Sequence, residues 1–174
     1  MSLKGKRALV TGASRGIGAA IAKALAAEGA DVAITYEKSA EAAGEVVNAI
    51  KAIGRRAVAI QADSADAAAV QASVEKTVAE LGGLDILVNN AGILRLSPVK
   101  DISLEDVNAL LNVNVRAPIV ASKAAIPHLG NATSELLEPG RLVGTCLSVG
   151  GSRSGAANTP PIVITDRSCS LVSQ

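Results

Sequence analysis

The chain has 174 residues, with 17 basic and 16 acidic side chains and a formal net charge of +1. This length suits one domain with a sizeable core, and the balanced charge argues against nucleic acid or an anionic membrane as a partner. No apolar run approaches the roughly 18 residues that span a bilayer, and no apolar stretch of signal-peptide length follows Met1. We therefore expect a cytoplasmic protein.

Aromatic residues are almost absent, because Tyr36 is the single tyrosine and the chain has no Phe or Trp. The core must therefore be built from Val, Ile, Leu and Ala, which suits buried parallel strands and closely packed helices. Cys146 and Cys169 are the two cysteines, and their spacing indicates neither a metal site nor a disulfide framework. No metal site is predicted.

Strand and helix patterns alternate along the chain. Apolar residues three or four apart indicate helices, and short uninterrupted apolar runs indicate buried strands. Strands are predicted at residues 7–10, 31–35, 57–61, 85–88 and 141–143, and helices at 15–28, 39–54, 66–81 and from 103 onward. Ser103 begins a capping-box pattern, and Pro118 is expected to kink or interrupt the last helix. Repeated units of this kind predict an α/β fold, a doubly wound parallel sheet with helices on both faces.

A glycine-rich segment follows the first predicted strand directly, since residues 11–18 read Thr-Gly-Ala-Ser-Arg-Gly-Ile-Gly. Glycines let the backbone turn tightly and approach a phosphate without a Cβ atom in the way. The N–H groups of the following helical turn face the anion along the positive end of the helix dipole. The segment predicts a pyrophosphate-binding loop, and the alternative is an ordinary strand-to-helix turn. The expected binding residues are Gly12, Ser14, Arg15, Gly16, Ile17 and Gly18.

Two further polar signals follow the third and fourth predicted strands. Asp63 comes after the third strand, and Asn-Asn-Ala-Gly at residues 89–92 follows the fourth. The carboxyl ends of parallel strands meet at one edge of the sheet, where ligands of such folds bind. The three signals are therefore expected to form one dinucleotide site on a Rossmann-type sheet.

The two glycine-containing motifs together carry a family resemblance. Thr-Gly-x-x-x-Gly-Ile-Gly at 11–18 with Asn-Asn-Ala-Gly at 89–92 resembles the short-chain dehydrogenase/reductase family, most of all its bacterial 3-oxoacyl-carrier-protein reductases. The resemblance covers roughly residues 4–143. It implies a dinucleotide-binding domain at 1–143, whose sheet is incomplete at its C-terminal side, and an atypical tail at 144–174.

The resemblance also implies roles for single residues. Asp63 matches an acidic residue near the adenine ring, and the alternative is a helix N-cap or loop carboxylate. Asn89 matches a residue that ties neighbouring strands together. Asn114 matches the helix asparagine of the catalytic group, which helps to hold a water in the proton relay, and the alternative is a polar residue at a helix irregularity. The cofactor contacts expected in this part of the chain are Asp63, Asn90, Ala91 and Gly92.

The end of the second predicted strand bears on the choice of cofactor. Members of the family that prefer NAD usually carry an acidic residue there, whereas this chain has Tyr36. Arg15 and Lys38 offer charges that pair with a 2′-phosphate, and Glu37 would repel that phosphate if it pointed inward. We expect NADP(H), and the alternative for Arg15 and Lys38 is a pair of solvated surface charges.

The catalytic part of the family pattern is not found in this chain. Ser148 is the candidate for the family's catalytic serine, and the alternative is an ordinary loop serine. Family members carry Tyr-x-x-x-Lys further on, with the tyrosine as proton donor, but the matching positions here fall near Pro161 and Thr165. No tyrosine follows Tyr36 and no lysine follows Lys123.

The composition changes abruptly after residue 143. This change motivates the hypothesis that the tail is read out of frame or is an alternative ending, although 162–165 has the pattern of a strand. Three functions stay open. They are an NADP(H)-dependent reductase of a small-molecule carbonyl or 3-oxoacyl substrate, a non-catalytic dinucleotide-binding protein, and a poorly stable truncated product. The family usually forms dimers or homotetramers.

Overall fold

The computed structural model describes residues 2–129, 146–148 and 162–165. The strands are β1 (Arg7–Val10), β2 (Asp31–Tyr36), β3 (Ala57–Gln61), β4 (Ile86–Asn89), β5 (Cys146–Ser148) and β6 (Ile162–Thr165). The α-helices are α1 (Gly16–Ala27), α2 (Ala40–Ala52), α3 (Ala67–Leu81), α4 (Leu104–Leu111) and α5 (Ala117–Ala125). Three short helical segments complete the described chain: η1 (Val99–Asp101), η2 (Asn112–Arg116) and η3 (Ile126–His128).

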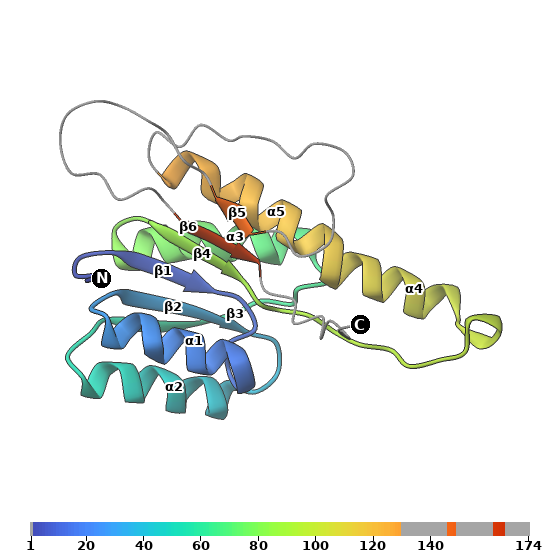
Figure 1. Ribbon diagram of the computed structural model, residues 1–174, viewed down its shortest axis with the longest axis horizontal. Helices are drawn as coiled ribbons and strands as arrows, with labels where there is room; N and C mark the ends of the chain where they lie inside the picture. Colours follow the sequence, from blue (N-terminus) through green and yellow to red (C-terminus); the bar gives the residue numbers. More distant parts are fainter. Residues whose placement is uncertain (1, 130–145, 149–161, 166–174) are drawn as a thin grey trace, which may run out of the picture.

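The strands form one sheet in the order β3-β2-β1-β4-β6-β5. Strand β1 pairs in parallel with β2 on one side and β4 on the other, and β6 continues the parallel pairing beyond β4. Strand β5 pairs antiparallel with β6. Helices α1 and α2 cover one face, and α3 and α5 cover the other (Figure 1). The doubly wound, Rossmann-type sheet expected from the sequence is confirmed.

The two faces of the sheet have separate cores because neighbouring residues of a strand point to opposite faces. Ala8 and Val10 pack with α1 and α2, whereas Leu9 between them packs with α3 and α5. The first core contains many alanines, including Ala22 and Ala26 of α1, so the helix backbone lies close to the sheet. This close packing is how a chain with one aromatic residue fills its core.

The helix starts agree with the capping signals of the sequence. The Ser103 hydroxyl accepts a hydrogen bond from the Asp106 N–H at 3.0 Å and donates one to the Asp106 carboxylate at 2.9 Å. Asp66 caps α3 by accepting the Ala68 N–H at 2.9 Å. Both bonds satisfy backbone groups that a helix leaves unpaired in its first turn.

The interruption predicted at Pro118 occurs, but it takes another form and lies earlier in the chain. Residues Asn112–Arg116 form a π-helical turn between α4 and α5. Pro118 follows it as the second residue of α5, where the helix continues directly from the π-helical turn. The expected kink at the proline is therefore wrong in position, and the wider turn precedes it.

The C-terminal strands differ in part from expectation. The strand predicted at 141–143 lies outside the described residues. The strand pattern at 162–165 is confirmed as β6, which pairs in parallel with β4. Among the residues that the structure describes, no helix is long and apolar enough to cross a membrane.

An ion-pair cluster joins β1 to the start of β4 at the amino edge of the sheet. The Asp85 carboxylate accepts hydrogen bonds from the Arg7 side chain at 2.7 Å and from the Arg7 N–H at 2.9 Å. The Lys6 ammonium lies 3.8 Å from its other oxygen. Burial raises the pKa of Asp85, but the hydrogen bonds and charge of Arg7, with a smaller contribution from Lys6, outweigh it, so the pKa falls below its ordinary value of 3.8.

This cluster gives a first prediction, on acid stability. Because the folded-state pKa of Asp85 is lowered, its contribution is fully present above pH 3.8 and is lost as the pH falls through the folded pKa. Asp85→Asn should therefore lower the free energy of unfolding at pH 7, by less than about 1 kcal/mol since the pair is partly exposed. Urea unfolding followed by circular dichroism at pH 7 and at about pH 3 measures it.

The same substitution at the exposed Asp101 is the control, because it removes an equal charge from η1. The difference in stability between wild type and Asp85→Asn should shrink at the acid pH. A difference that stays constant between the two pH values would contradict the role of this ion pair.

Candidate functional site

The glycine-rich segment forms the connection from β1 to α1. Gly12 and Gly16 have φ angles of +64° and +60°, a left-handed conformation that side chains with a Cβ rarely adopt. A Cβ atom added at Gly12 would lie 2.8 Å from the Cα atom of Ala91. Arg15 is the N-cap of α1, and its side chain makes no capping hydrogen bond. The loop is therefore pressed against residues 89–92 and leads into an open helix N-terminus.

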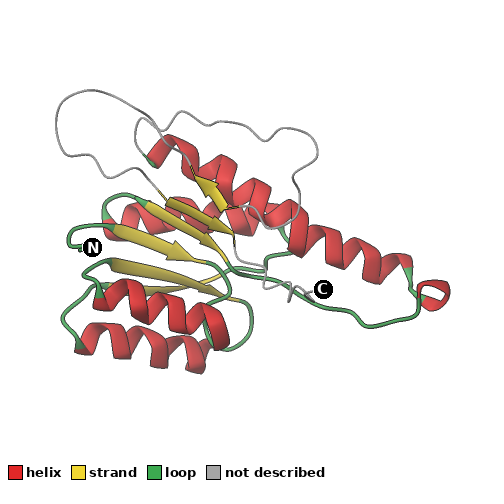
Figure 2. Cartoon of the chain, viewed as in Figure 1, coloured by secondary structure: helices red, strands yellow, loops and turns green. Residues whose placement is uncertain are grey.

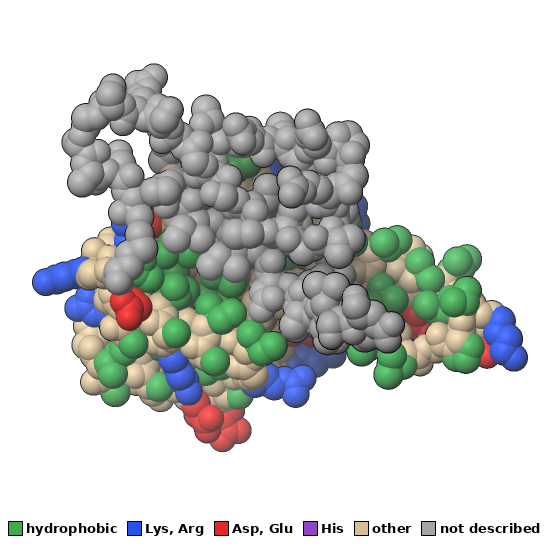
Figure 3. Space-filling model, in the orientation of Figure 1, with side chains coloured by type: hydrophobic (Ala, Val, Ile, Leu, Met, Phe, Trp, Pro, Cys, Tyr) green, Lys and Arg blue, Asp and Glu red, His purple; other side chains and the backbone are tan. Residues whose placement is uncertain are grey.

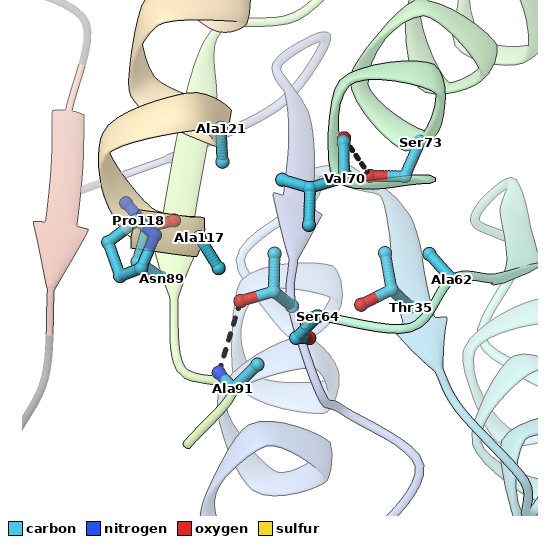
Figure 4. Close-up of a pocket in the computed structure, with 11 residues that line it drawn as sticks. Thr35, Ala62, Ser64, Val70, Ser73, Asn89, Ala91, Ala117, Pro118 and Ala121 are labelled. Atoms are coloured by element: carbon cyan, nitrogen blue, oxygen red, sulfur yellow. Dashed lines mark hydrogen bonds between the residues drawn. The ribbon is translucent and has the colours of Figure 1, made fainter. Parts of the chain in front are cut away.

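Hydrogen bonds interlock the two motifs. The Thr11 hydroxyl accepts the backbone N–H groups of Asn90 at 3.0 Å and Ala91 at 3.1 Å; the latter is a dashed line in Figure 4. The Asn90 side-chain amide donates to the carbonyls of Thr11 at 2.8 Å and Gly12 at 3.1 Å. Segments 79 residues apart in the sequence therefore form one structural unit.

Asn89 and Asn90 have different hydrogen-bond partners among the described residues, and only Asn90 contacts the glycine loop. The Asn89 side chain is 5% exposed and donates to the Ser122 hydroxyl of α5 at 3.3 Å. It therefore joins β4 to a covering helix. Asn89 is the last residue of β4 and Asn90 follows the strand, so the two side chains contact different neighbours. The strand-tying role that the family resemblance implies for Asn89 stays a prediction.

Asn114 lies in the π-helical turn and holds the backbone after Gly92. Its side-chain oxygen accepts the Ile93 N–H at 2.9 Å, and its side-chain amide donates to the Ile93 carbonyl at 2.8 Å. A Cβ atom at Gly92 would lie 3.2 Å from the same oxygen. The side chain therefore fixes the course of the chain from β4 towards α4. Its expected part in a proton relay stays a prediction.

The other expected nucleotide contacts lie around the ends of β2 and β3. Asp63 is an exposed loop carboxylate that accepts the Ala65 N–H at 2.8 Å, and the N-cap of α3 is Asp66. The Lys38 ammonium lies 3.0 Å from a carboxylate oxygen of Glu37, and this hydrogen bond and charge raise the pKa of Lys38. Tyr36, the last residue of β2, is half-buried, and Arg15 is exposed.

A small pocket opens beside these residues between α3, α5 and the carboxyl ends of the strands (Figure 4). Its walls combine small apolar side chains with hydroxyl and amide groups. They are Thr11, Thr35, Ala62, Ser64, Val70, Ser73, Asn89, Ala91, Ala117, Pro118 and Ala121. The polar members lie deep, since Thr35 and Ser73 are each 2% exposed. The pocket includes Thr11 of the glycine loop and Ala91 of residues 89–92, so it lies at the same edge of the sheet as both motifs.

Two features of this edge are not apparent in the sequence patterns. Thr11 and Thr35 both hold loop backbone through their hydroxyls, yet an isolated threonine at a strand end is an ordinary residue. The segment from β4 to α4 projects from the body of the molecule (Figures 1 and 2) and exposes Leu94, Leu96 and Val99. Figure 3 shows the apolar side chains along this projection.

The other expected residues are placed as follows. Ser14, Ile17 and Gly18 belong to the loop and the first turn of α1, and Ile17 is 55% exposed. Ser148 is the last residue of β5, an edge strand. In the part of the chain that the structure describes, no group of three or more His, Cys, Asp or Glu residues could hold a metal ion.

Known proteins share this sequence over most of its length. A family profile described as short chain dehydrogenase matches residues 6–158. Hydroxynaphthalene reductase arp2 of Aspergillus fumigatus is 47% identical over 129 residues, covering 74% of this chain and 47% of that protein. Versicolorin reductase 1 of Aspergillus parasiticus is 46% identical over 127 residues, covering 73% and 48% respectively.

Solved structures agree in fold. A short chain dehydrogenase from Burkholderia cenocepacia J2315 in complex with NADP has a TM-score of 0.74 and 68% identity, covering 75% of this chain and 53% of that one. A blue fluorescent protein from a metagenomic library in complex with NADPH has a TM-score of 0.71 and 52% identity, covering 73% and 52%. The chain spans about half the length of the curated relatives it matches. The profile match, the interlocked motifs and the sheet order together show that the chain belongs to the short-chain dehydrogenase family.

Proposed function

We propose that this protein is an NADP(H)-dependent oxidoreductase that reduces a carbonyl group of a small molecule, such as a ketone or a 3-oxoacyl thioester, to an alcohol. The observation that carries this proposal is the interlock of the glycine loop with residues 89–92 at the N-terminus of α1. The nicotinamide nucleotide supplies the hydride when it is bound. The described residues of this chain bind and orient the nucleotide.

The glycine loop fits a pyrophosphate. Gly12 and Gly18 leave no room for a Cβ atom, since one at Gly18 would lie 2.9 Å from both the Ala13 Cα atom and the Gly12 carbonyl. The first-turn N–H groups of α1 have no capping side chain, so they are directed at the space beyond the loop together with the positive end of the helix dipole. A diphosphate placed there receives hydrogen bonds and a favourable field without any rearrangement of the loop.

The charges near the end of β2 support NADP(H) over NAD(H). Arg15 and Lys38 offer positive charge for a 2′-phosphate, and two similar structures were solved with NADP or NADPH. Glu37 opposes this preference because it pairs with Lys38 at 3.0 Å. We therefore expect Glu37 to reduce the preference of this chain for NADP(H) over NAD(H).

A second prediction tests this effect of Glu37. Glu37→Gln removes the carboxylate that neutralises Lys38 and repels a 2′-phosphate, so the dissociation constant for NADPH should fall about three- to tenfold. The constant for NADH, which has no 2′-phosphate, should change by less than about twofold. Fluorescence titration of both nucleotides measures the two constants. An equal change for NADPH and NADH would show that Glu37 does not act through the phosphate.

A second candidate function is nucleotide binding without turnover. The observation that favours it is the sequence itself, in which no tyrosine follows Tyr36 and no lysine follows Lys123. Tyr36 is the last residue of β2, a position that we propose for the adenosine end of the site. This candidate predicts that the 174-residue chain binds NADPH but does not oxidise it with any ketone or 3-oxoacyl thioester. Binding followed by fluorescence and turnover followed by NADPH absorbance separate the two candidates, and a poorly stable product would show neither binding nor a cooperative melt.

We further propose that residues 144–174 are an atypical tail after the dinucleotide-binding domain at 1–143, although the family profile extends to residue 158 and β6 of this tail pairs with β4. Translating the coding DNA from the Gly130 codon onward in all three frames tests its origin. A Tyr-x-x-x-Lys in a neighbouring frame supports a shifted reading of an ordinary reductase. Its absence from every frame contradicts that reading and favours nucleotide binding without turnover.

We also propose a cytoplasmic protein, and a homo-oligomer of the kind that the family resemblance implies. The exposed apolar side chains of α4 and α5 support the assembly, because Leu104 is 80% and Ile119 is 60% exposed. Sedimentation equilibrium of the purified chain tests it, and a monomer at high concentration would contradict it.

A further inference from the structure

Thr35 lies at the point where β2 meets the glycine loop. It is the penultimate residue of β2, a strand flanked on both sides by β1 and β3, and it is 2% exposed. Figure 4 shows it on the wall of the pocket at the carboxyl edge of the sheet. A threonine at a strand end has no special meaning in a sequence, so its role must be found in its contacts.

Thr35 binds two consecutive amides of the glycine loop. Its hydroxyl accepts the Gly12 N–H at 3.0 Å, and its main-chain carbonyl accepts the Ala13 N–H at 2.9 Å. The second bond is available to any residue at this position because it uses the backbone. The first bond is specific to a side chain with an acceptor at the β position.

The bond to Gly12 acts at the most constrained position of the loop. Gly12 has a φ angle of +64°, and Ala91 lies against it on one side, where an added Cβ atom would be 2.8 Å from the Ala91 Cα atom. Thr35 holds the same residue through its N–H. Gly12 is therefore clamped between β2 and the segment after β4, which sets the direction in which the loop leaves β1.

We propose that Thr35 is a positioning residue for nucleotide binding, whose hydroxyl fixes the glycine loop in the conformation that presents the first turn of α1 to a diphosphate. This inference rests on the proposed function, because it names a residue that holds the nucleotide-binding loop of the same site in place. Without the hydroxyl, the Gly12 N–H loses its partner in a half-buried place, and the loop gains conformations that do not match the diphosphate.

Thr35→Val tests the role, since valine keeps the β-branched shape that suits a strand and removes only the hydroxyl. The dissociation constant for NADPH, from fluorescence titration of the 174-residue chain, should rise about tenfold, the effect of one buried hydrogen bond. Thr35→Ala, a second variant without the hydroxyl, should show the same loss. Thr35→Ser keeps the acceptor and should bind within about twofold of wild type.

Amide hydrogen exchange supplies a readout that does not depend on the nucleotide. In Thr35→Val, exchange at Gly12 should accelerate about tenfold or more as its bond is lost. Exchange at Ala13 should stay near the wild-type rate, because the main-chain carbonyl of residue 35 is unchanged. Equal acceleration at both amides would show general loosening and contradict a specific role of the hydroxyl.

Thr77→Val is the matched control. Thr77 is fully buried in α3, and its hydroxyl donates to the Ser73 carbonyl at 2.8 Å, away from the glycine loop. It should lower the melting temperature but leave the NADPH constant within about twofold. The role of Thr35 is overturned if Thr77→Val weakens NADPH binding as much as Thr35→Val does, or if Thr35→Val binds NADPH as tightly as wild type. It is also overturned if Thr35→Ser loses NADPH affinity like Thr35→Val. A wild-type chain that binds no NADPH overturns the proposed function and this role with it.

Discussion

Gly12→Ala is expected to abolish detectable NADPH binding, with a dissociation constant raised about a hundredfold or more. Two effects add at this position. An alanine at a φ of +64° is strained by about 1–2 kcal/mol, and its Cβ would lie 2.8 Å from the Ala91 Cα atom, so backbone must move. Together they should lower the free energy of unfolding by about 2–4 kcal/mol. Urea unfolding and fluorescence titration measure the two quantities.

Two other glycines of the chain separate these effects. Gly16 has a φ of +60° with open space around the added Cβ, so Gly16→Ala should show the strain alone, about 1–2 kcal/mol. Gly44 lies inside α2 with a helical backbone and open space, so Gly44→Ala should stabilise the chain by about 0.5–1 kcal/mol and leave binding unchanged. The loss in free energy of unfolding should be largest for Gly12→Ala and smaller for Gly16→Ala, whereas Gly44→Ala should show no loss. Equal effects at Gly12 and Gly16 would contradict the importance of the contact with Ala91.

Asn90→Asp is expected to have the second-largest effect. The wild-type amide donates to the carbonyls of Thr11 at 2.8 Å and Gly12 at 3.1 Å. Aspartate has nearly the same shape, but its carboxylate accepts hydrogen bonds and repels both carbonyl oxygens. The ends of β1 and β4 should therefore separate, with a loss of about 2–3 kcal/mol in the free energy of unfolding at pH 7 and a dissociation constant for NADPH raised at least about tenfold.

Asn48→Asp is the matched control, because it makes the same chemical change on the exposed side of α2. It should alter the stability by less than about 0.5 kcal/mol and leave NADPH binding unchanged. Asn90→Asp should partly recover stability as the pH falls and its carboxyl group becomes protonated, since the protonated form donates a hydrogen bond again. Stability equal to wild type at pH 7 would contradict the interlock of the two motifs.

The element order of this protein could be predicted from its sequence with small errors at the ends. The ranges expected for β1 and β3 agree with the structure, β2 differs by one residue at its end, and β4 is shifted by one residue at both ends. The reason is local. Buried parallel strands are uninterrupted apolar runs, and the glycines at 12, 29, 54 and 82 all take positive φ values that end one element before the next begins.

The turn between α4 and α5 was only partly predictable. Pro118 indicated that the helix would be interrupted, but the interruption is a π-helical turn at Asn112–Arg116. That turn places Asn114 against both the N–H and the carbonyl of Ile93, 21 residues away. The destabilising effect of a proline in a helix can be predicted from the sequence because it is local. The stabilising hydrogen bonds to a distant backbone partner cannot be predicted in this way.

The strands and helices, the glycine loop and the residues that gather at one edge of the sheet could be predicted from the sequence, because they follow from periodicity, from glycine's conformational freedom and from the shared direction of parallel strands. Which side chains hold the loop became clear only from the folded structure. The hydroxyl of Thr35 binds the Gly12 N–H 23 residues away, and the amide of Asn90, not that of Asn89, joins segments 79 residues apart. These partners meet only when β2, β1 and β4 lie side by side, and hydrogen-bond geometry at that point selects one side chain over its neighbour.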